Sequence, residues 1–435
     1  MIRLQNVRCV VVCSYLLLVL GLSLPMLTLA KEQSFTDAME TSLVVSSEVA
    51  VDKDEVQKSE ILVIPEIEID LPMQSKLTGI ARIRADADKS IDPDDQTDVE
   101  LRELYLQTDI GRSLWTLGKQ QVVWGKADGL KVLDVVNPRD FREFILDDFD
   151  NARIPLWMVN AEIPIEDVTL QLLWIPDQTY HKFASTKGLY AFRSSTLVPT
   201  VPADVVVDLQ NPTEPDHRFG DADWGFRLSS FWKGWDLSAN YLYHYSDTPV
   251  LFRELSTTPT GVKATMTPRY ERSHLIGGTF SNAFGDLTLR GELGYSTDRY
   301  ISTNDATDSD GIVKNNELAY VMGLDWYGFS DSLVSLQFFQ TRLSQNKKQM
   351  IRDGLDSTLT LLLKRVFLND TLSSEILWLH NIDMGDGLLR PKVSYDLNDE
   401  IQLWLGVDVF YGDDDGLFGQ FTERDRFVSG IEISL

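Results

Sequence analysis

Cysteine is almost absent from this 435-residue sequence, which contains only Cys9 and Cys13. Both lie in the first 30 residues, a segment that we expect to be removed when the chain is exported. The remaining chain then lacks the residue required for disulfides, thiolate catalysis and cysteine-based metal sites.

Positive charge is also scarce. Lysine and arginine number 40 against 66 aspartates and glutamates, which gives a formal net charge of −26. Proteins that bind nucleic acid need clusters of basic side chains to neutralise phosphates, so nucleic acid is not an expected partner. Hydrophobic residues still make up 43% of the chain, which argues against a disordered protein.

Long hydrophobic runs are missing after residue 30, and a membrane-spanning helix needs about 20 apolar residues. The first 30 residues differ, because Arg3 and Arg8 flank the start of an apolar stretch at 10–22 and Thr28-Leu29-Ala30 forms a small-x-small cleavage sequence. These features predict a signal peptide over residues 1–30. An exported acidic chain of this kind is a periplasmic protein, a secreted protein or an outer-membrane barrel.

The alternation of apolar and polar residues distinguishes among these classes. Residues 234–246, 286–296, 316–327 and 399–411 alternate with a period of two, and similar strands are expected at 40–51, 59–70, 75–86, 98–109, 113–123, 156–163 and 167–176. Many of these runs approach the 9–11 residues or so that a tilted transmembrane strand needs. The sequence predicts an all-β fold, a transmembrane antiparallel β-barrel of about 18 strands formed by residues 31–435, with 16 strands as the alternative.

The connections between the expected strands alternate in length. Short turns are expected at 233–234, 284–286, 329–331, 369–370 and 398–399, and longer polar segments at 246–265, 297–315, 344–356 and 412–423. Short periplasmic turns and long extracellular loops are typical of outer-membrane barrels. The proline-rich stretch 177–221 is expected to be a long extracellular loop.

Aromatic residues gather near the ends of the expected strands. Examples are Trp124, Trp157, Trp174, Trp232 and Trp326. Aromatic girdles mark the two membrane interfaces of such barrels. We therefore expect the cell outer membrane as the location, with its lipid and lipopolysaccharide as partners.

The segment 118–155 lacks the period of two and alternates opposite charges instead. We expect residues 124–155 to fold inward as a constriction loop, the alternative being an external loop held by surface salt bridges. The polar and charged candidates for this loop are Lys126, Asp128, Lys131, Asp134, Asn137, Arg139, Asp140, Arg142 and Glu143.

The same segment carries a family resemblance. Gly118-Lys119-Gln120, Trp124-Gly125, Asp134 and Asn137-Pro138-x-Asp140 together resemble the hallmark of a family of porin-like Gram-negative outer-membrane proteins of unknown function. The resemblance implies a large single-chain barrel and passage or export of a solute across the outer membrane. It implies no particular solute.

In a barrel, the polar row of each strand faces the lumen. The candidates for lining the pore are Arg227, Asp236, His244, Arg290, Glu292, Asp325, Arg342, Asp408 and Glu432. Charges of both signs are present, as in water-filled pores whose selectivity depends on charged rings. The overall acidity favours cationic or neutral solutes.

We therefore expect an outer-membrane channel for small solutes, without cofactor or metal. The five histidines lie in no G-x-S-x-G or H-E-x-x-H sequence, so an enzyme is not expected. An alternative is the outer-membrane component of an export or surface-assembly system that works with a periplasmic or inner-membrane partner. A structural or adhesive surface protein is a third possibility, and the sequence favours no oligomeric state.

Overall fold

The computed structural model describes residues 38–435 except positions 54, 89–90, 92, 94–95, 200–201, 203, 216–218, 260, 346 and 348. The predicted signal peptide at 1–30 lies outside the described residues. Within them, no helix is both long enough and apolar enough to span a membrane.

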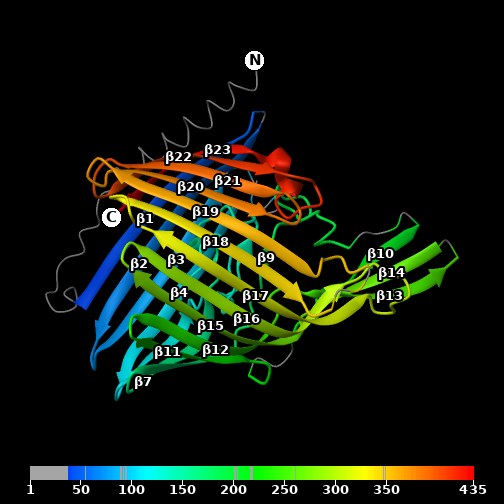
Figure 1. Ribbon diagram of the computed structural model, residues 1–435, viewed down its shortest axis with the longest axis horizontal. Helices are drawn as coiled ribbons and strands as arrows, with labels where there is room; N and C mark the ends of the chain where they lie inside the picture. The colour runs from blue at the N-terminus through cyan, green and yellow to red at the C-terminus, as the bar shows by residue number, and fades with distance from the viewer. Residues whose placement is uncertain are drawn as a thin grey trace.

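Eighteen antiparallel strands form a closed barrel (Figure 1). In chain order they are β1 (Met39–Val51), β2 (Val56–Leu71), β3 (Ser75–Asp86), β4 (Thr97–Ile110), β5 (Ser113–Gln120), β7 (Leu156–Ile165), β8 (Val168–Ile175), β11 (Asp223–Trp232), β12 (Trp235–Tyr245), β15 (Arg272–Phe284), β16 (Leu287–Ser302), β17 (Ile312–Trp326), β18 (Ser332–Leu343), β19 (Leu355–Phe367), β20 (Leu372–Asn381), β21 (Gly387–Asp396), β22 (Ile401–Tyr411) and β23 (Arg426–Ser434). The predicted all-β barrel of about 18 strands is confirmed, and the alternative of 16 is wrong.

The barrel closes between its first and last strands. β1 pairs with β2 along one edge and with β23 along the other, in a register that runs from Val44 opposite Ser434 to Val51 opposite Phe427. Closure leaves no free strand edge in the ring, so the backbone N–H and C=O groups find partners without water.

Each strand has one apolar outer row and one polar inner row. On β16, Glu292 is 3% exposed, whereas the adjacent Leu293 is 52% exposed. On β22, Asp408 is 3% exposed and Leu405, in the opposite row, is 67% exposed. The exposed apolar row suits lipid, and the chain is an outer-membrane barrel by its fold.

The connections at the two ends of the barrel differ as predicted. Residues 111–112, 166–167 and 233–234 are tight turns between consecutive strands, whereas 121–155 and 176–222 are long segments that start from the other end. We refer to the short-turn end and the long-loop end of the barrel.

Two predicted loops contain strands. β13 (Val250–Thr258) lies within the predicted segment 246–265, and β14 (Gly261–Arg269) begins in it and ends four residues after it. β10 (Val205–Leu209) lies within 177–221. They form a separate sheet in the order β10-β14-β13, which projects away from the barrel (Figure 1). The sequence analysis predicted no strands in these two connections. Strands form there because the segments pair with one another rather than with the barrel.

The remaining elements are short. β6 (Asp140–Phe141) pairs in parallel with β9 (Lys182–Phe183), the α2 helix covers Phe149–Ala152, and the 3-10 helix η2 covers Gly419–Arg424. β6 and α2 belong to the long connection between β5 and β7, so that connection has local structure of its own.

Candidate functional site

The segment of residues 121–155, which we call the β5–β7 segment, contacts strands all around the barrel. Its partners in order around the ring are Asp236 of β12, Glu292 of β16, Gln337 of β18, Arg390 of β21, Arg426 of β23, Lys58 of β2, Arg84 of β3 and Arg102 of β4. These side chains belong to the inner rows of a closed ring. Only a segment that lies inside the ring can reach all of them.

Two glycines allow the chain to enter this segment. Gly118 has φ +133°, and a Cβ there would lie 2.2 Å from the carbonyl oxygen of Leu104. A Cβ on Gly125 would lie 2.9 Å from the backbone nitrogen of Asp134. Glycine is the residue that permits such close backbone approach, which gives both motif glycines a structural role.

Asn137 fastens the middle of the segment to its two ends. Its side-chain oxygen accepts the Val122 N–H (2.8 Å), and its amide donates to the carbonyl of Ile154 (2.9 Å). The Ile154 N–H in turn donates to the carbonyl of Pro138 (2.8 Å). Asn137 is 2% exposed, so these bonds satisfy backbone groups that water does not reach.

Asp134 neutralises two arginines inside the segment. Its Oδ2 accepts hydrogen bonds from Arg139 Nη2 (2.9 Å) and Arg153 Nη2 (3.0 Å). Arg153 also donates to Gln121 (3.1 Å) and Asp150 (2.9 Å). A buried charge is tolerated only when it is paired, so this cluster accounts for several of the opposite charges in the sequence.

Glu292 of β16 binds the segment to the barrel through backbone groups. Its carboxylate accepts the N–H of Ala127 (2.8 Å), of Leu133 (3.0 Å) and of Lys126. Each hydrogen bond to a charged group contributes about 1.5–3 kcal/mol. Glu292 is one of the predicted pore-lining candidates. It lies on the inner row of β16, and at 3% exposure it is covered by the segment that it anchors.

We expect Glu292→Ala to increase the amide hydrogen exchange of Lys126, Ala127 and Leu133, because the variant removes their common acceptor. Exchange measured by mass spectrometry on the refolded protein checks this. Glu317→Ala is the matched control, since that inner-row carboxylate instead binds Arg352 (2.6 Å). Unchanged exchange at 126–133 in the Glu292 variant would contradict the anchoring role.

Beside Glu292, further charges of the segment pair with the barrel. Arg290 Nε contacts Asp325 (2.9 Å), and the same guanidinium binds Asp128 of the segment. Lys126 pairs with Asp236 of β12. On this side of the lumen, the two cations Lys126 and Arg290 thus bind three carboxylates, and Glu292 binds backbone N–H groups.

On the opposite side, Lys58 of β2 collects three carboxylates. Its Nζ lies 3.0 Å from Glu143 of the segment, 3.1 Å from Glu48 and 3.4 Å from Glu60. Lys58 is 3% exposed. Two of these carboxylates have a second cation, since Arg84 contacts Glu60 (2.8 Å) and Arg426 contacts Glu143 (3.7 Å).

Asp408 of β22 lies between two arginines. It accepts from Arg390 Nε (2.8 Å) and from Arg426 Nε (2.7 Å). Arg390 also donates to the carbonyl of Leu146 (2.8 Å). This hydrogen bond holds residues 146–151, which we call the tip of the segment, against β21.

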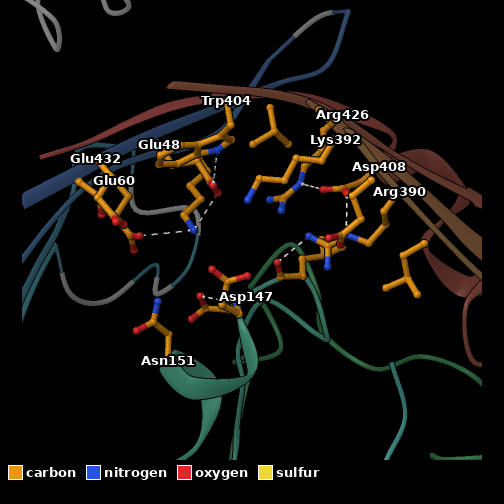
Figure 2. Close-up of a pocket in the computed structure, with 18 of the residues that line it drawn as sticks. Glu48, Glu60, Asp147, Asn151, Arg390, Lys392, Trp404, Asp408, Arg426 and Glu432 are labelled. Carbon is orange, nitrogen blue, oxygen red and sulfur yellow. Dashed lines mark hydrogen bonds and ion pairs between the residues drawn. The ribbon is translucent and has the colours of Figure 1, made fainter. Parts of the chain in front are cut away.

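A polar cavity of about 190 Å³ lies between this tip and strands β1, β2 and β20–β23. Figure 2 shows Glu60 and Glu432 on one side of it, Arg390 and Asp408 on the other, and Asp147 and Asn151 of the segment between them. Seven carboxylates line it against four cations; they are Glu48, Glu60, Asp147, Asp148, Glu375, Asp408 and Glu432 against Lys58, Arg390, Lys392 and Arg426. The cavity thus carries an excess of three negative charges.

The other loop candidates stabilise the segment itself. Burial would raise the pKa of Asp140, but hydrogen bonds from the Arg142 guanidinium (2.6 and 3.0 Å) hold that pKa below its ordinary value. Burial lowers the pKa of Lys131, whose ammonium donates to the carbonyl of Ala127 (2.7 Å). Of the nine candidates, five have side chains that reach the barrel strands: Lys126, Asp128, Asn137, Arg142 and Glu143.

Eight of the nine pore-lining candidates lie on inner rows, and Arg342 is the exception. Arg342 pairs with Leu318 and Leu355 and shares its row of β18 with Leu336, which is 45% exposed. It therefore lies on the outer face, near the long-loop end. A charge is tolerated there because the cost of an exposed charge falls toward the membrane interface.

The sequence analysis predicted that Trp124 belongs to an aromatic girdle. The structure places it elsewhere. It is 1% exposed, and its indole N–H donates to Gln171 of β8 (2.8 Å). It packs with Leu133, Leu242 and other buried residues inside the barrel. The prediction failed because β5 ends at Gln120, four residues before Trp124.

Sequence reasoning missed the basic residues of the first four strands. Arg82 and Arg102 both donate to the carbonyl of Asn151 (3.0 and 3.1 Å), and Arg84 contacts Asp147 (3.1 Å). Arg82 and Arg84 alternate with apolar residues in β3, so their shared inner row was readable in the sequence. Among the described residues, no group of three or more His, Cys, Asp or Glu side chains is arranged to hold a metal ion.

Residues 74–434 match the model of a family described as "Protein of unknown function (DUF1302)". No curated protein matches the sequence.

Several solved outer-membrane structures share the fold. Pseudomonas aeruginosa OpdK with vanillate is 10% identical with a TM-score of 0.52, over 92% of this chain and 99% of that chain. P. aeruginosa OccD3 (OpdP) is 9% identical with a TM-score of 0.52, over 93% of each chain. Acinetobacter baumannii OccAB3 is 8% identical with a TM-score of 0.52, over 92% of this chain and 98% of that chain. At these identities the likeness concerns the barrel fold alone.

Proposed function

The chain belongs to the DUF1302 family of proteins of unknown function, and from this premise and its geometry we propose that it is an outer-membrane channel for small polar solutes. The solutes that it favours are neutral or cationic. The observation that carries the proposal is the polar cavity inside the barrel, lined by seven carboxylates and four cations. Small-solute passage needs such a water-accessible polar lumen.

In this proposal, the β5–β7 segment is the constriction. Support comes from its anchors on both sides of the lumen, at Glu292 on one side and at Lys58 and Arg390 on the other. A segment held at several points keeps a fixed cross-section open beside it. The long loop at 177–221 is proposed to lie on the extracellular side, as long barrel loops do.

The proposed charge preference depends on which of the carboxylates that line the cavity have no ion pair. Glu432 and Asp148 line the cavity without an ion pair to another described residue, and Glu375 lies 4.0 Å from Lys364. Two of the lining cations lie over aromatic rings, Lys392 5.2 Å from the centre of Trp404 and Arg426 5.9 Å from the centre of Tyr190. A solute that enters therefore encounters unpaired carboxylates, which attract cations and repel anions.

The test is ion selectivity in a planar bilayer. The refolded chain should give single-channel steps, and its reversal potential in a salt gradient should indicate cation preference. We expect Glu375→Gln with Glu432→Gln to lower the cation/anion permeability ratio severalfold, because both side chains face the cavity. Asp208→Asn, on the sheet that projects from the barrel, is the control and should leave the ratio unchanged. Absence of conductance would refute the channel, and an unaltered ratio would refute the charge preference.

A further inference from the structure

The projecting sheet β10-β14-β13 has two unlike faces. Its register places Val207 beside Ala264 and Ala264 beside Leu255, and the next row joins Met266 and Arg253. Apart from Arg253 and Thr257, the residues of this face are apolar. The opposite face carries the ion pair of Lys263 with Asp208 (2.8 Å). An apolar face is expected only where a sheet is covered on that side.

A hollow of about 490 Å³ lies against the apolar face. Its other sides are formed by Pro199 and Pro202 and by the connection from Ser302 to Gly311 between β16 and β17. Three separate connections of the long-loop end thus enclose one space. The volume is in the range of small-molecule sites, roughly 300–1,000 Å³, which are mostly apolar with a few placed polar groups.

Arg253 supplies the placed polar group. Its guanidinium donates to the carbonyls of Thr303 (3.4 Å), Asp305 (2.6 Å) and Asp308 (2.8 Å), and its Nε is buried without a hydrogen-bond partner. It forms no ion pair with a carboxylate among the described residues. Backbone carbonyls fix the position of the guanidinium. The carboxylate of Asp305 interacts with its charge from a distance but does not form an ion pair with it.

The second polar group, Asp204, lies at the far end of the hollow. Arg253 lies opposite Met266, which in turn lies opposite Leu209 of β10. Asp204 is the residue before Val205, at the other end of β10. Five residue steps along a strand separate these positions, about 16 Å at the usual rise per residue. The hollow is therefore positive at the end nearer the barrel and apolar along its length.

We propose that this hollow binds an aliphatic carboxylate, with the chain along the sheet and the carboxylate at Arg253. The apolar rows exclude water from the aliphatic chain, and the Arg253 guanidinium supplies the cation with which the carboxylate pairs. The site lies outside the lumen, so it is independent of the proposed channel.

The experiment is photolabelling of the mature protein in lipid nanodiscs with a diazirine analogue of dodecanoate, followed by peptide mapping. We expect label on peptides from 202–209 and 250–269, displaced by dodecanoate and less well by dodecanol. Ala264→Trp, which fills the hollow at a residue 4% exposed, should abolish that label. Thr265→Trp, on the opposite face of the same strand, is the matched control and should retain it.

Arg253→Gln separates the head group from the chain. It should weaken displacement by dodecanoate roughly tenfold, the order of one charge-assisted hydrogen bond, and leave displacement by dodecanol unchanged. The β-sheet circular dichroism spectrum confirms that each variant is folded. Label confined to lipid-facing strands, label that survives Ala264→Trp, or equal displacement by the acid and the alcohol would overturn the proposal.

Discussion

Replacing residues 123–153 with a short glycine-serine turn is expected to raise the single-channel conductance severalfold. The replacement is geometrically simple because Gln120 at the end of β5 and Leu156 at the start of β7 are paired neighbours. All the strand pairs of the barrel remain, since none includes the removed residues. The lumen then loses the segment that contacts both of its sides, and its open cross-section increases.

The control removes a different long-loop structure. Val250 and Arg269 are also paired neighbours, so the hairpin between them can be replaced by the same turn. That hairpin belongs to the projecting sheet, and its loss should leave the conductance unchanged. Equal conductance of the two deletion variants and the intact protein, recorded in the same bilayers, would rule out a constriction in the β5–β7 segment.

The second large effect concerns the lipid-facing row. Leu405 lies near the middle of β22 and is 67% exposed. We expect Leu405→Arg to destabilise the folded barrel by about 2–4 kcal/mol, the cost of a cationic side chain on the lipid face at the bilayer midplane. Reversible unfolding in denaturant, with the protein folded in lipid vesicles, measures this difference.

A cation at the same depth on the inner row provides the comparison. Gly406 pairs with Val428, which lines the polar cavity, whereas Leu405 pairs with Ser429. We expect Val428→Arg to cost far less than Leu405→Arg, because water and carboxylates surround it. If both substitutions had the same effect, the assignment of the two faces would be incorrect.

The strands were predictable because their signal is local. A strand with lipid on one side and water on the other must alternate, so the predicted segments 75–86 and 399–411 agree closely with β3 and β22. The same period was present at 262–266, but this stretch was assigned to the polar segment 246–265 and its continuation. The alternation there reports an amphipathic sheet outside the membrane, and the period alone does not distinguish the two environments.

The site was only partly predictable. Acidic and basic residues of the β5–β7 segment were recognised as a group, yet the roles of Glu292 and Lys58 depend on partners far away in the sequence. Glu292 binds backbone groups 159–166 residues earlier. Arg342 was assigned to the inner row but lies on the outer face. Near the end of a strand, a polar residue is compatible with the inner row and with the membrane interface, so the sequence does not distinguish the two positions.

The sequence by itself determined the barrel, through two-faced strands, short and long connections in alternation, and an acidic chain without cysteine after residue 13. The tertiary structure decided which charges meet, because ring closure brings β1, β2 and β20–β23 around one cavity and the β5–β7 segment crosses to reach them. Local periodicity encodes the face on which a side chain lies. Only the path of the chain through three dimensions determines which side chain it faces.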